Sequence, residues 1–372
     1  VSTDKMPLAP HEFALMDMLF SNSDAFLCKP QPGYETCRYV FFPGCQAGAI
    51  APDVVMDAYE DLCARVEGGV GLILGCCGAI SEWAGRYEMT EKVNEQLKQE
   101  LAKLGDPVII AGCPSCMKQL KENTGAEVRG IWEILKEIGL PGKARGLEMP
   151  VAIHDACGAR GDARTQDTIR ELLTAMGCTV EDTEYSRDLS PCCGYGGLTA
   201  YANKEMAAKM TEKCLERSDA PYITYCMACR DRFAREGRES RHILELLYGD
   251  NACNMPDISE KRYNRLVLKE KLLKNIWNEE LMMEKKDYTV AYTEDAIRMM
   301  DERMILKSDV EHVLADYRES QEAVFDEEAK ELVTRSRLGN VTFWVRFVET
   351  EEGYLVRRAY SHRMNIMKRV GQ

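Results

Sequence analysis

Ten of the sixteen cysteines in this 372-residue chain repeat one pattern twice. Each copy has a single cysteine, then a vicinal Cys-Cys-Gly, then a Cys-x-x-Cys pair. The first quintet consists of Cys45, Cys76, Cys77, Cys113 and Cys116. The second quintet consists of Cys157, Cys192, Cys193, Cys226 and Cys229. Equivalent cysteines are 112, 116 and 113 positions apart, which indicates an internal duplication with small changes in loop length.

Clustered thiolates of this kind bind either zinc or iron–sulfur clusters. Five thiols per copy exceed the four ligands of a structural zinc ion and also the four of an ordinary iron–sulfur cluster. The glycine after each vicinal pair lets backbone amides approach the sulfur atoms closely. The pattern therefore favours an iron–sulfur centre in each copy. A zinc site and a metal-free dithiol are the alternatives.

The segments around these cysteines alternate between short apolar stretches and stretches with helical spacing. Apolar stretches run into the cysteines at 38–45, 70–76, 107–113, 151–157 and 222–226. This alternation predicts parallel α/β packing, in which the carboxyl ends of the strands collect the ligand-binding residues. We expect an α/β fold with two duplicated parallel-sheet, cysteine-rich units packed pseudo-symmetrically, followed by a small α+β extension.

Four regions follow from these patterns: an N-terminal arm (1–37), two cysteine-rich domains (38–150 and 151–254) and a charged α+β extension (255–372). In the extension, Ser308-Asp-Val-Glu311 is typical of a capping box that opens a helix carrying Val310, Val313, Leu314 and Tyr317. Residues 341–348 and 354–361 are predicted to pair as a hairpin. We find no chemistry in this extension.

Composition excludes several classes of protein. The chain is 45% hydrophobic and has 61 acidic against 48 basic residues, a formal charge of −13. An acidic chain without a basic block is a poor nucleic-acid binder. No apolar run reaches the ~20 residues of a transmembrane helix, and residues 1–10 lack the pattern of a signal peptide. We therefore expect a cytoplasmic protein, free or peripheral to a membrane complex, in which clustered cysteines bind metal rather than form disulfides.

The cysteine motifs resemble the paired CCG domains of the heterodisulfide reductase B family, which also occur in the iron–sulfur subunits of glycolate and lactate oxidases. The matching segments, within about 38–249, are 41–45, 75–78, 113–116, 154–160, 191–197 and 226–229. The resemblance implies two noncubane [4Fe-4S] clusters, one per quintet, with all ten cysteines as ligands. It also implies cleavage of a disulfide between the clusters, each half being bound as a thiolate to one cluster iron. Cys45 and Cys157 would then be catalytic.

His154 lies three residues before Cys157, and with an ordinary pKa it could move a proton during thiolate release. The alternative is that it only orders the loop. Outside the quintets, Cys63, Cys178, Cys214 and Cys253 are expected to be core residues. Cys28 and Cys37 could share a metal with a partner, but nothing in the chain completes a four-ligand set.

The function expected from these observations is an oxidoreductase subunit of a larger complex that reduces a disulfide or similar substrate. Because the chain has no flavin or nucleotide motif, its electrons must come from partners, for which a flavoprotein and a ferredoxin-type subunit are the natural candidates. Two alternatives stay open. One is an electron relay between a flavin 2-hydroxy-acid dehydrogenase and a quinone. The other is a zinc-stabilised scaffold.

Overall fold

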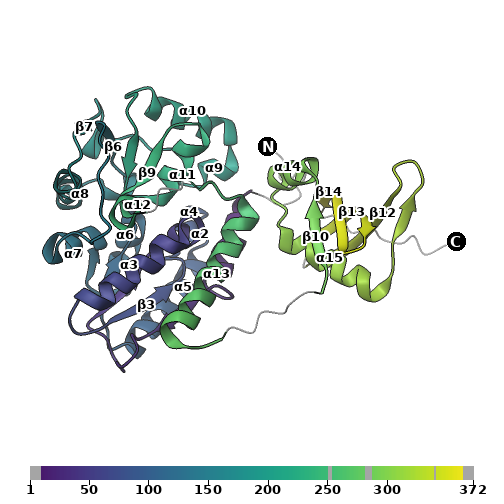
Figure 1. Cartoon of the computed structure of the whole chain (residues 1–372), viewed down its shortest axis with the longest axis horizontal. Coiled ribbons are helices and arrows are strands. Elements are labelled where there is room, and N and C mark those ends of the chain that lie inside the picture. The colour runs from purple at the N-terminus through teal and green to yellow at the C-terminus, as the bar shows by residue number, and fades with distance from the viewer. Residues whose placement is uncertain (1–9, 250–253, 281–286, 339–340, 363–372) are drawn as a thin grey trace. The chain divides into compact units, whose positions relative to one another are not determined.

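The computed structural model describes residues 10–249, 254–280, 287–338 and 341–362. These residues form two compact units, which are described separately. The cysteine-rich unit contains the described residues of 14–256 and 260–281. The C-terminal unit contains 10–13, 257–259 and the described residues from 287 onward. Figure 1 shows the elements of both units along the chain.

The first half of the cysteine-rich unit is built on a five-stranded sheet of order β1-β3-β2-β4-β5. Its strands are β1 (Leu27–Lys29), β2 (Tyr39–Phe42), β3 (Val70–Leu74), β4 (Val108–Ala111) and β5 (Val128–Gly130). All neighbours are parallel except β1, which pairs antiparallel with β3 at the edge. The helices of this half are residues 14–21 of α1 (Pro10–Ser21), α2 (Cys45–Ile50), α3 (Pro52–Arg65), α4 (Ala79–Trp83), α5 (Tyr87–Lys103), α6 (Pro114–Thr124) and α7 (Ile131–Ile138).

The second half has a fully parallel sheet of order β7-β6-β8-β9. Its strands are β6 (Val151–His154), β7 (Val180–Asp182), β8 (Tyr222–Thr224) and β9 (Ser240–His242). Its helices are η2 (Cys157–Ala159), α8 (Ala163–Ala175), η3 (Arg187–Leu189), α9 (Thr199–Ala202), α10 (Lys204–Leu215), α11 (Met227–Arg235) and α12 (Ile243–Tyr248), followed by the long α13 (Ile258–Trp277). Strand for strand this order repeats β3-β2-β4-β5, so the predicted duplication and parallel α/β fold are confirmed.

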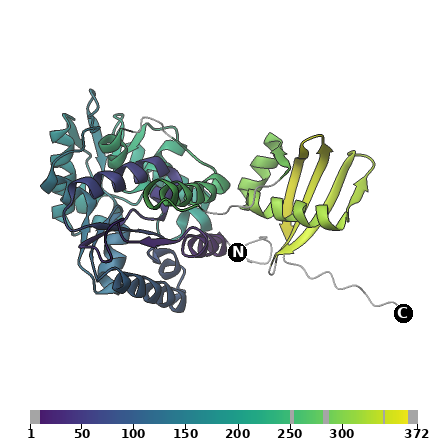
Figure 2. The same cartoon turned by 60° about the horizontal axis from the view of Figure 1, so that its bottom comes forward.

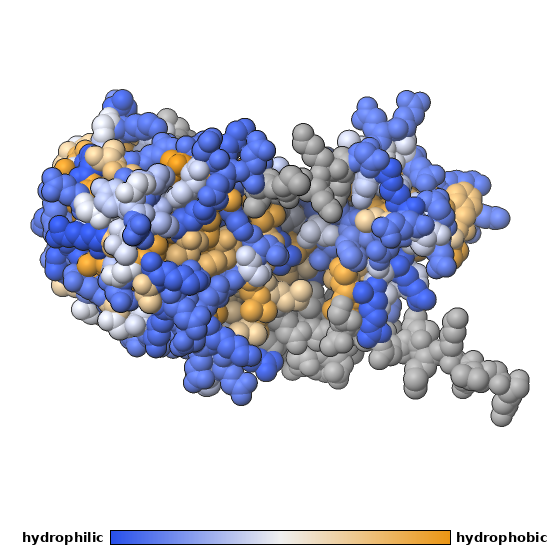
Figure 3. All heavy atoms as spheres, turned by 90° about the horizontal axis from the view of Figure 1, so that it is seen from below, coloured by the Kyte–Doolittle hydropathy of each residue, from blue (hydrophilic) through white to orange (hydrophobic). Residues whose placement is uncertain are grey.

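The two halves share one hydrophobic core, which includes Phe41 and Ile110 from the first sheet and Ile153 and Ile223 from the second. Parallel strands buried on both faces explain the nearly continuous apolar runs in the sequence. Figure 2 shows the same halves from another side. In the face visible in Figure 3 the exterior is mostly hydrophilic, with a hydrophobic patch near the centre of this unit and smaller hydrophobic spots toward its edges.

The C-terminal unit is a five-stranded sheet of order β10-β14-β13-β12-β11 with two helices. Its elements are β10 (Thr289–Tyr292), α14 (Glu294–Arg303), α15 (Lys307–Ser320), β11 (Val324–Asp326), β12 (Glu331–Leu338), β13 (Val341–Thr350) and β14 (Gly353–His362). The predicted hairpin is confirmed as β13 and β14, in which Thr350 pairs with Gly353. All four apolar residues expected on the helix are buried on α15.

Two expectations about this part of the chain need correction. The sequence pattern places the N-cap at Ser308, but the N-cap of α15 is Leu306, two residues earlier, and the Asp309 carboxylate accepts the Leu306 N–H at 2.9 Å. The pattern also starts the extension at residue 255, but most of α13 packs in the cysteine-rich unit, where Leu268 and Leu272 enter the shared core. Charged residues on the other faces of α13 hide this apolar stripe in the sequence. No helix among the described residues has the length and apolarity to cross a membrane.

A fully buried ion pair fixes the CxxC helix of the second half. The Arg230 guanidinium on α11 donates to the Glu245 carboxylate on α12, with Nη2–Oε1 at 2.6 Å and Nε–Oε2 at 3.2 Å. Neither side chain is exposed to solvent. The same carboxylate accepts the His242 N–H at 2.7 Å, so Glu245 joins α11 to the end of β9.

We expect Arg230→Met to lower the free energy of unfolding by about 3–5 kcal/mol, because it leaves the Glu245 carboxylate buried without its cation. Urea unfolding of the whole chain, followed by circular dichroism, measures this change. The control is Lys209→Met, which breaks an exposed pair with Glu205 and should cost less than ~1 kcal/mol. Equal effects for the two variants would contradict the prediction.

Candidate metal centre

The first quintet lies at the carboxyl ends of three neighbouring strands. Cys45 follows β2 and starts α2, while Cys76 and Cys77 follow β3. Cys113 follows β4 and caps α6, whose first turn carries Cys116. Because β3, β2 and β4 are adjacent and parallel, their ends meet at one edge of the sheet.

Glycines bring these strand ends into contact. Gly44 has φ +91°, and a Cβ there would lie 3.3 Å from the Cys116 sulfur. A Cβ on Gly112 would lie 2.7 Å from the carbonyl oxygen of Pro43, closer than real Cβ atoms approach. The loops after β2 and β4 therefore pack together only because both positions lack a side chain.

The second quintet repeats this placement at the ends of the second sheet. Cys157 lies in η2 after β6, and Cys226 follows β8 and caps α11, which carries Cys229. The vicinal pair Cys192 and Cys193 differs, because η3 separates it from β7. The Thr211 hydroxyl holds this pair in place by donating to the Cys193 carbonyl at 2.8 Å.

Each half also packs its first cysteine segment against the CxxC helix of the other half. Helix α2, which begins at Cys45, contacts α11, and η2, which begins at Cys157, contacts α6. A Cβ on Gly158 would lie 2.9 Å from the backbone nitrogen of Ser115. The halves are thus interlocked by a reciprocal contact, which confirms the expected pseudo-symmetric packing.

The ten thiols form one unbroken series of interacting neighbours. Within the first quintet the side chains interact in the order Cys45, Cys76, Cys77, Cys116, Cys113. Within the second quintet the order is Cys226, Cys229, Cys193, Cys192, Cys157. The two series meet where Cys113 interacts with Cys226. The structure therefore brings all ten predicted cysteines together and places the two quintets in direct contact.

A cavity of about 70 Å³ adjoins the first quintet. All five of its cysteines line the cavity, and the second half contributes Cys226 and Tyr195 to the wall. The other lining residues are mainly small or apolar, such as Ala79 and Ile80. The site of the first quintet is therefore closed by residues of both halves.

The thiol pKa values diverge within each quintet. Hydrogen bonds with Cys116 and Cys76 lower the pKa of Cys77 to about 6. The neighbouring thiol of Cys113 instead raises the pKa of Cys116 well above its ordinary value. In the second quintet, hydrogen bonds with Cys157 and then Cys193 lower the pKa of Cys192 to about 2. Each group of sulfur atoms therefore favours partial deprotonation, which is the state that binds metal.

A protein-family model described as "Cysteine-rich domain" (CCG) matches residues 39–121 and 151–234. The chain carries two CCG domains. Both matches fall inside the two predicted cysteine-rich domains and contain all ten quintet cysteines.

Two curated proteins are similar to part of the chain. An uncharacterized iron–sulfur protein of Methanocaldococcus jannaschii is 29% identical over 170 residues, which are 44% of this chain and 33% of that protein. An uncharacterized iron–sulfur protein of Methanococcus maripaludis is 27% identical over 208 residues, 52% of this chain and 40% of that protein. The chain thus spans about a third to two fifths of the length of these relatives.

The donor set of the CCG domains consists of cysteine thiols, which are the ligands of iron–sulfur clusters. All fifteen described cysteines are free thiols, and Cys253 lies outside the described residues. In the part of the chain that the structure describes, no three Cys, His, Asp or Glu side chains are placed to hold a single metal ion. The quintet thiols follow one another in series, so each quintet offers five sulfur ligands.

The expectation that His154 has an ordinary pKa is wrong. Its side chain is 4% exposed, packs edge-on against Phe233 with ring centroids 4.8 Å apart, and leaves Nε2 without a hydrogen-bond partner among the described residues. Burial lowers the pKa to about 4, although Asp155 and Cys192 oppose the shift. A histidine that is neutral at pH 7 does not supply protons readily. The ordinary pKa on which the predicted proton transfer by His154 depended is therefore absent.

Residues outside the motifs also hold the first quintet. The Asn22 amide clamps the backbone of Cys76, accepting its N–H at 2.7 Å and donating to its carbonyl at 3.2 Å. Arg265 on α13 donates to the Cys45 carbonyl at 3.0 Å. Tyr195, which lines the cavity of the first quintet, lies in the Gly-Tyr-Gly-Gly loop after the second vicinal pair. Of Asn22, Arg265 and Tyr195, Tyr195 alone lies next to a motif that the sequence reveals.

The remaining described cysteines do not extend the site. Burial raises the pKa of Cys63 and of Cys214 to about 11, as suits inert core thiols. Burial and the Glu100 carboxylate raise the pKa of Cys28 to about 12, which disfavours the thiolate needed for metal binding.

We expect the free energy of unfolding to fall as pH decreases from 6.5 toward 4, because the unfolded chain then binds a proton at His154 that the folded chain does not. The contribution of His154 to the free energy of unfolding is at most about 3 kcal/mol. It is fully present above the pKa that His154 has in the unfolded chain. Urea unfolding at a series of pH values should show a shallower dependence for His154→Gln. His312→Gln, at a half-exposed histidine, serves as the control, and an unchanged slope for His154→Gln would refute the assignment.

Proposed function

We propose that this chain is an iron–sulfur oxidoreductase subunit of the heterodisulfide reductase B type. It would hold two noncubane [4Fe-4S] clusters, one per quintet, and pass electrons from partner proteins to a disulfide substrate. The observation that carries the proposal is the unbroken contact among ten free thiols, with five supplied by each CCG domain. The names of the two curated relatives, both iron–sulfur proteins, support the same cofactor.

Each quintet would bind its cluster through cysteine thiolates. When bound, the clusters supply one-electron storage and iron to which a substrate sulfur can bind. The chain contributes burial, the close backbone approach at Gly44 and Gly112, and N–H groups at the starts of α6 and α11, which favour negative charge.

Reduction of a disulfide consumes two electrons and two protons: RS–SR′ + 2 e⁻ + 2 H⁺ → RSH + R′SH. The electrons come from partners of the flavoprotein and ferredoxin classes. Because Cys113 and Cys226 are neighbours, the two sites can share the two electrons that one disulfide needs. Cys45 and Cys157 stand at opposite ends of the thiol series, and we assign them to the sites where the two halves of the substrate are handled. We assign no role in proton delivery to His154, because it is buried and neutral at pH 7.

Anaerobic reconstitution with iron and sulfide tests the cofactor. We expect about eight iron atoms per chain, visible absorption and an EPR signal on reduction. Cys77→Ser should remove about half of the iron, because it breaks one quintet. Cys63→Ser, at a cysteine outside both quintets, should leave iron content unchanged. A colourless protein with stoichiometric zinc, or equal iron in both variants, would overturn the proposal.

The electron acceptor is tested separately on the reduced, reconstituted chain. Stopped-flow mixing with small disulfides should reoxidise the clusters and release two thiols per disulfide. Cys157→Ser should slow this reaction at least tenfold, whereas Cys178→Ser should not. Rapid oxidation by a quinone analogue, with no reaction toward any disulfide, would instead identify the chain as an electron relay.

A further inference from the structure

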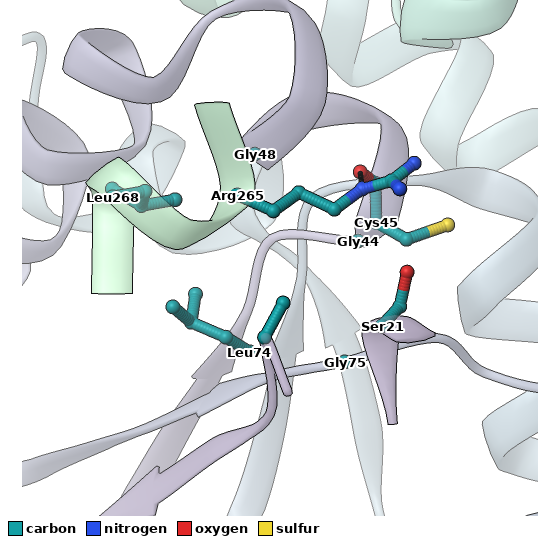
Figure 4. Close-up of a pocket in the computed structure, with 9 residues that line it drawn as sticks. Ser21, Gly44, Cys45, Gly48, Leu74, Gly75, Arg265 and Leu268 are labelled. Carbon is teal, nitrogen blue, oxygen red and sulfur yellow. Dashed lines mark hydrogen bonds between the residues drawn. The ribbon is translucent and has the colours of Figure 1, made fainter. Parts of the chain in front are cut away.

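Arg265 lies outside both CCG domains, yet its guanidinium reaches the first quintet. The side chain is 4% exposed and lines a small cavity of about 20 Å³ together with Cys45 and Ser21. In Figure 4 the guanidinium and the Ser21 hydroxyl both point toward the region of the Cys45 thiol. Helix α13 thus supplies a buried positive charge to a site that the CCG motifs do not complete.

Two hydrogen bonds fix the orientation of the Arg265 guanidinium, and its third nitrogen has no hydrogen-bond partner among the described residues. Nε donates to the Cys45 carbonyl at 3.0 Å, and Nη1 donates to the Asp17 carboxylate at 2.7 Å. Nη2 is buried and has no partner among the described residues. Burying an N–H of a charged group without an acceptor is costly, so this nitrogen marks a position where negative charge is accommodated.

Asp17 bonds to the guanidinium of Arg265, whereas Arg265 bonds to Cys45. The Cys76 thiol and burial together raise the pKa of Cys45. Of the nearby charged groups, Arg265 lowers that pKa and Asp17 raises it. Arg265 is therefore the member of this ion pair that bonds directly to Cys45, through the Cys45 carbonyl.

The equivalent cysteine of the second quintet has different surroundings, because the cation of this half that acts nearby, Arg217, influences Cys214 and His154 rather than ranking among the main influences on Cys157. The main influences on the Cys157 thiol are Cys192, burial and other cysteines, and no cation is among them. The duplication is therefore symmetric in its ligands, but the charged groups around the first cysteine of each quintet differ.

We propose that Arg265, oriented by Asp17, makes the two sites unequal by stabilising added negative charge at the first quintet. Arg265 is a positioning and charge-compensating residue for Cys45, and the first site accepts an electron at a higher potential than the second. This inference rests on the proposed function, since it requires a cluster in each quintet.

The test is a redox titration of the anaerobically reconstituted full chain, followed by EPR without substrate. The wild type should show two separate one-electron steps. Arg265→Gln should shift only the higher step downward by at least tenfold in the reduction equilibrium, which is about 59 mV for one electron. Asp17→Asn should shift the same step upward, because it removes the opposing charge while Arg265 stays.

Opposite shifts separate an electrostatic role from a structural one, since damage to the fold would move both variants in the same direction. The double variant should return toward the wild-type potential. Lys269→Gln, one helical turn along α13, loses a cation that bonds to the Asp24 carbonyl, and it should leave both steps unchanged.

The outcomes also separate the two proposals. Two intact cluster signals whose potentials do not respond to Arg265→Gln and Asp17→Asn would overturn the inference and leave the proposed function standing. Shifts of the same sign would do so as well. Absence of any cluster in the reconstituted wild type would overturn both.

Discussion

Ten buried or half-buried thiols in mutual contact are costly to place in a protein interior, and the reciprocal packing of the two halves is what holds them there. Helix α2 packs on α11 and η2 packs on α6, so each CxxC pair is covered by the other half's first cysteine segment. The contact depends on glycine, because a side chain at Gly158 would collide with the backbone of Ser115. Neither half could form its site alone with the same enclosure.

This constraint explains why the shared core runs through both sheets. Trp132 on α7 is fully buried, packs edge-on against Tyr225 in the second half, and donates from its indole N–H to the Thr165 hydroxyl at 3.2 Å. Such contacts fix the two sheets relative to each other, and the alignment of strand ends at the thiol series follows from them. Packing between the two sheets, at a distance from the cysteines, therefore determines how the sulfur atoms are positioned relative to one another.

Sequence reasoning reached the fold and the ligand set because both depend on local, repeated patterns. Apolar strands that end in cysteine predict parallel sheets with thiols at one edge, and spacing reveals the duplication. It missed short strands such as β5 and β9, whose three residues carry no periodicity. It also missed the contact of Cys113 with Cys226, because a junction between two domains has no signature in either one. The burial of His154 was equally hidden, since a four-residue apolar strand does not say which of its residues are enclosed.

Asn22 and Arg265 show a further limit of motif reasoning. Both lie outside the CCG matches, on opposite sides of them in the chain, and both hold the first quintet rather than the second. The second quintet is instead held from within its own half, by Thr211 at Cys193. The two matching sets of cysteine ligands alone predict two equivalent sites. The buried arginine beside the first set predicts that the two sites are reduced one after the other. When two identical donor sets are surrounded by different charges, the surroundings decide which set is reduced first.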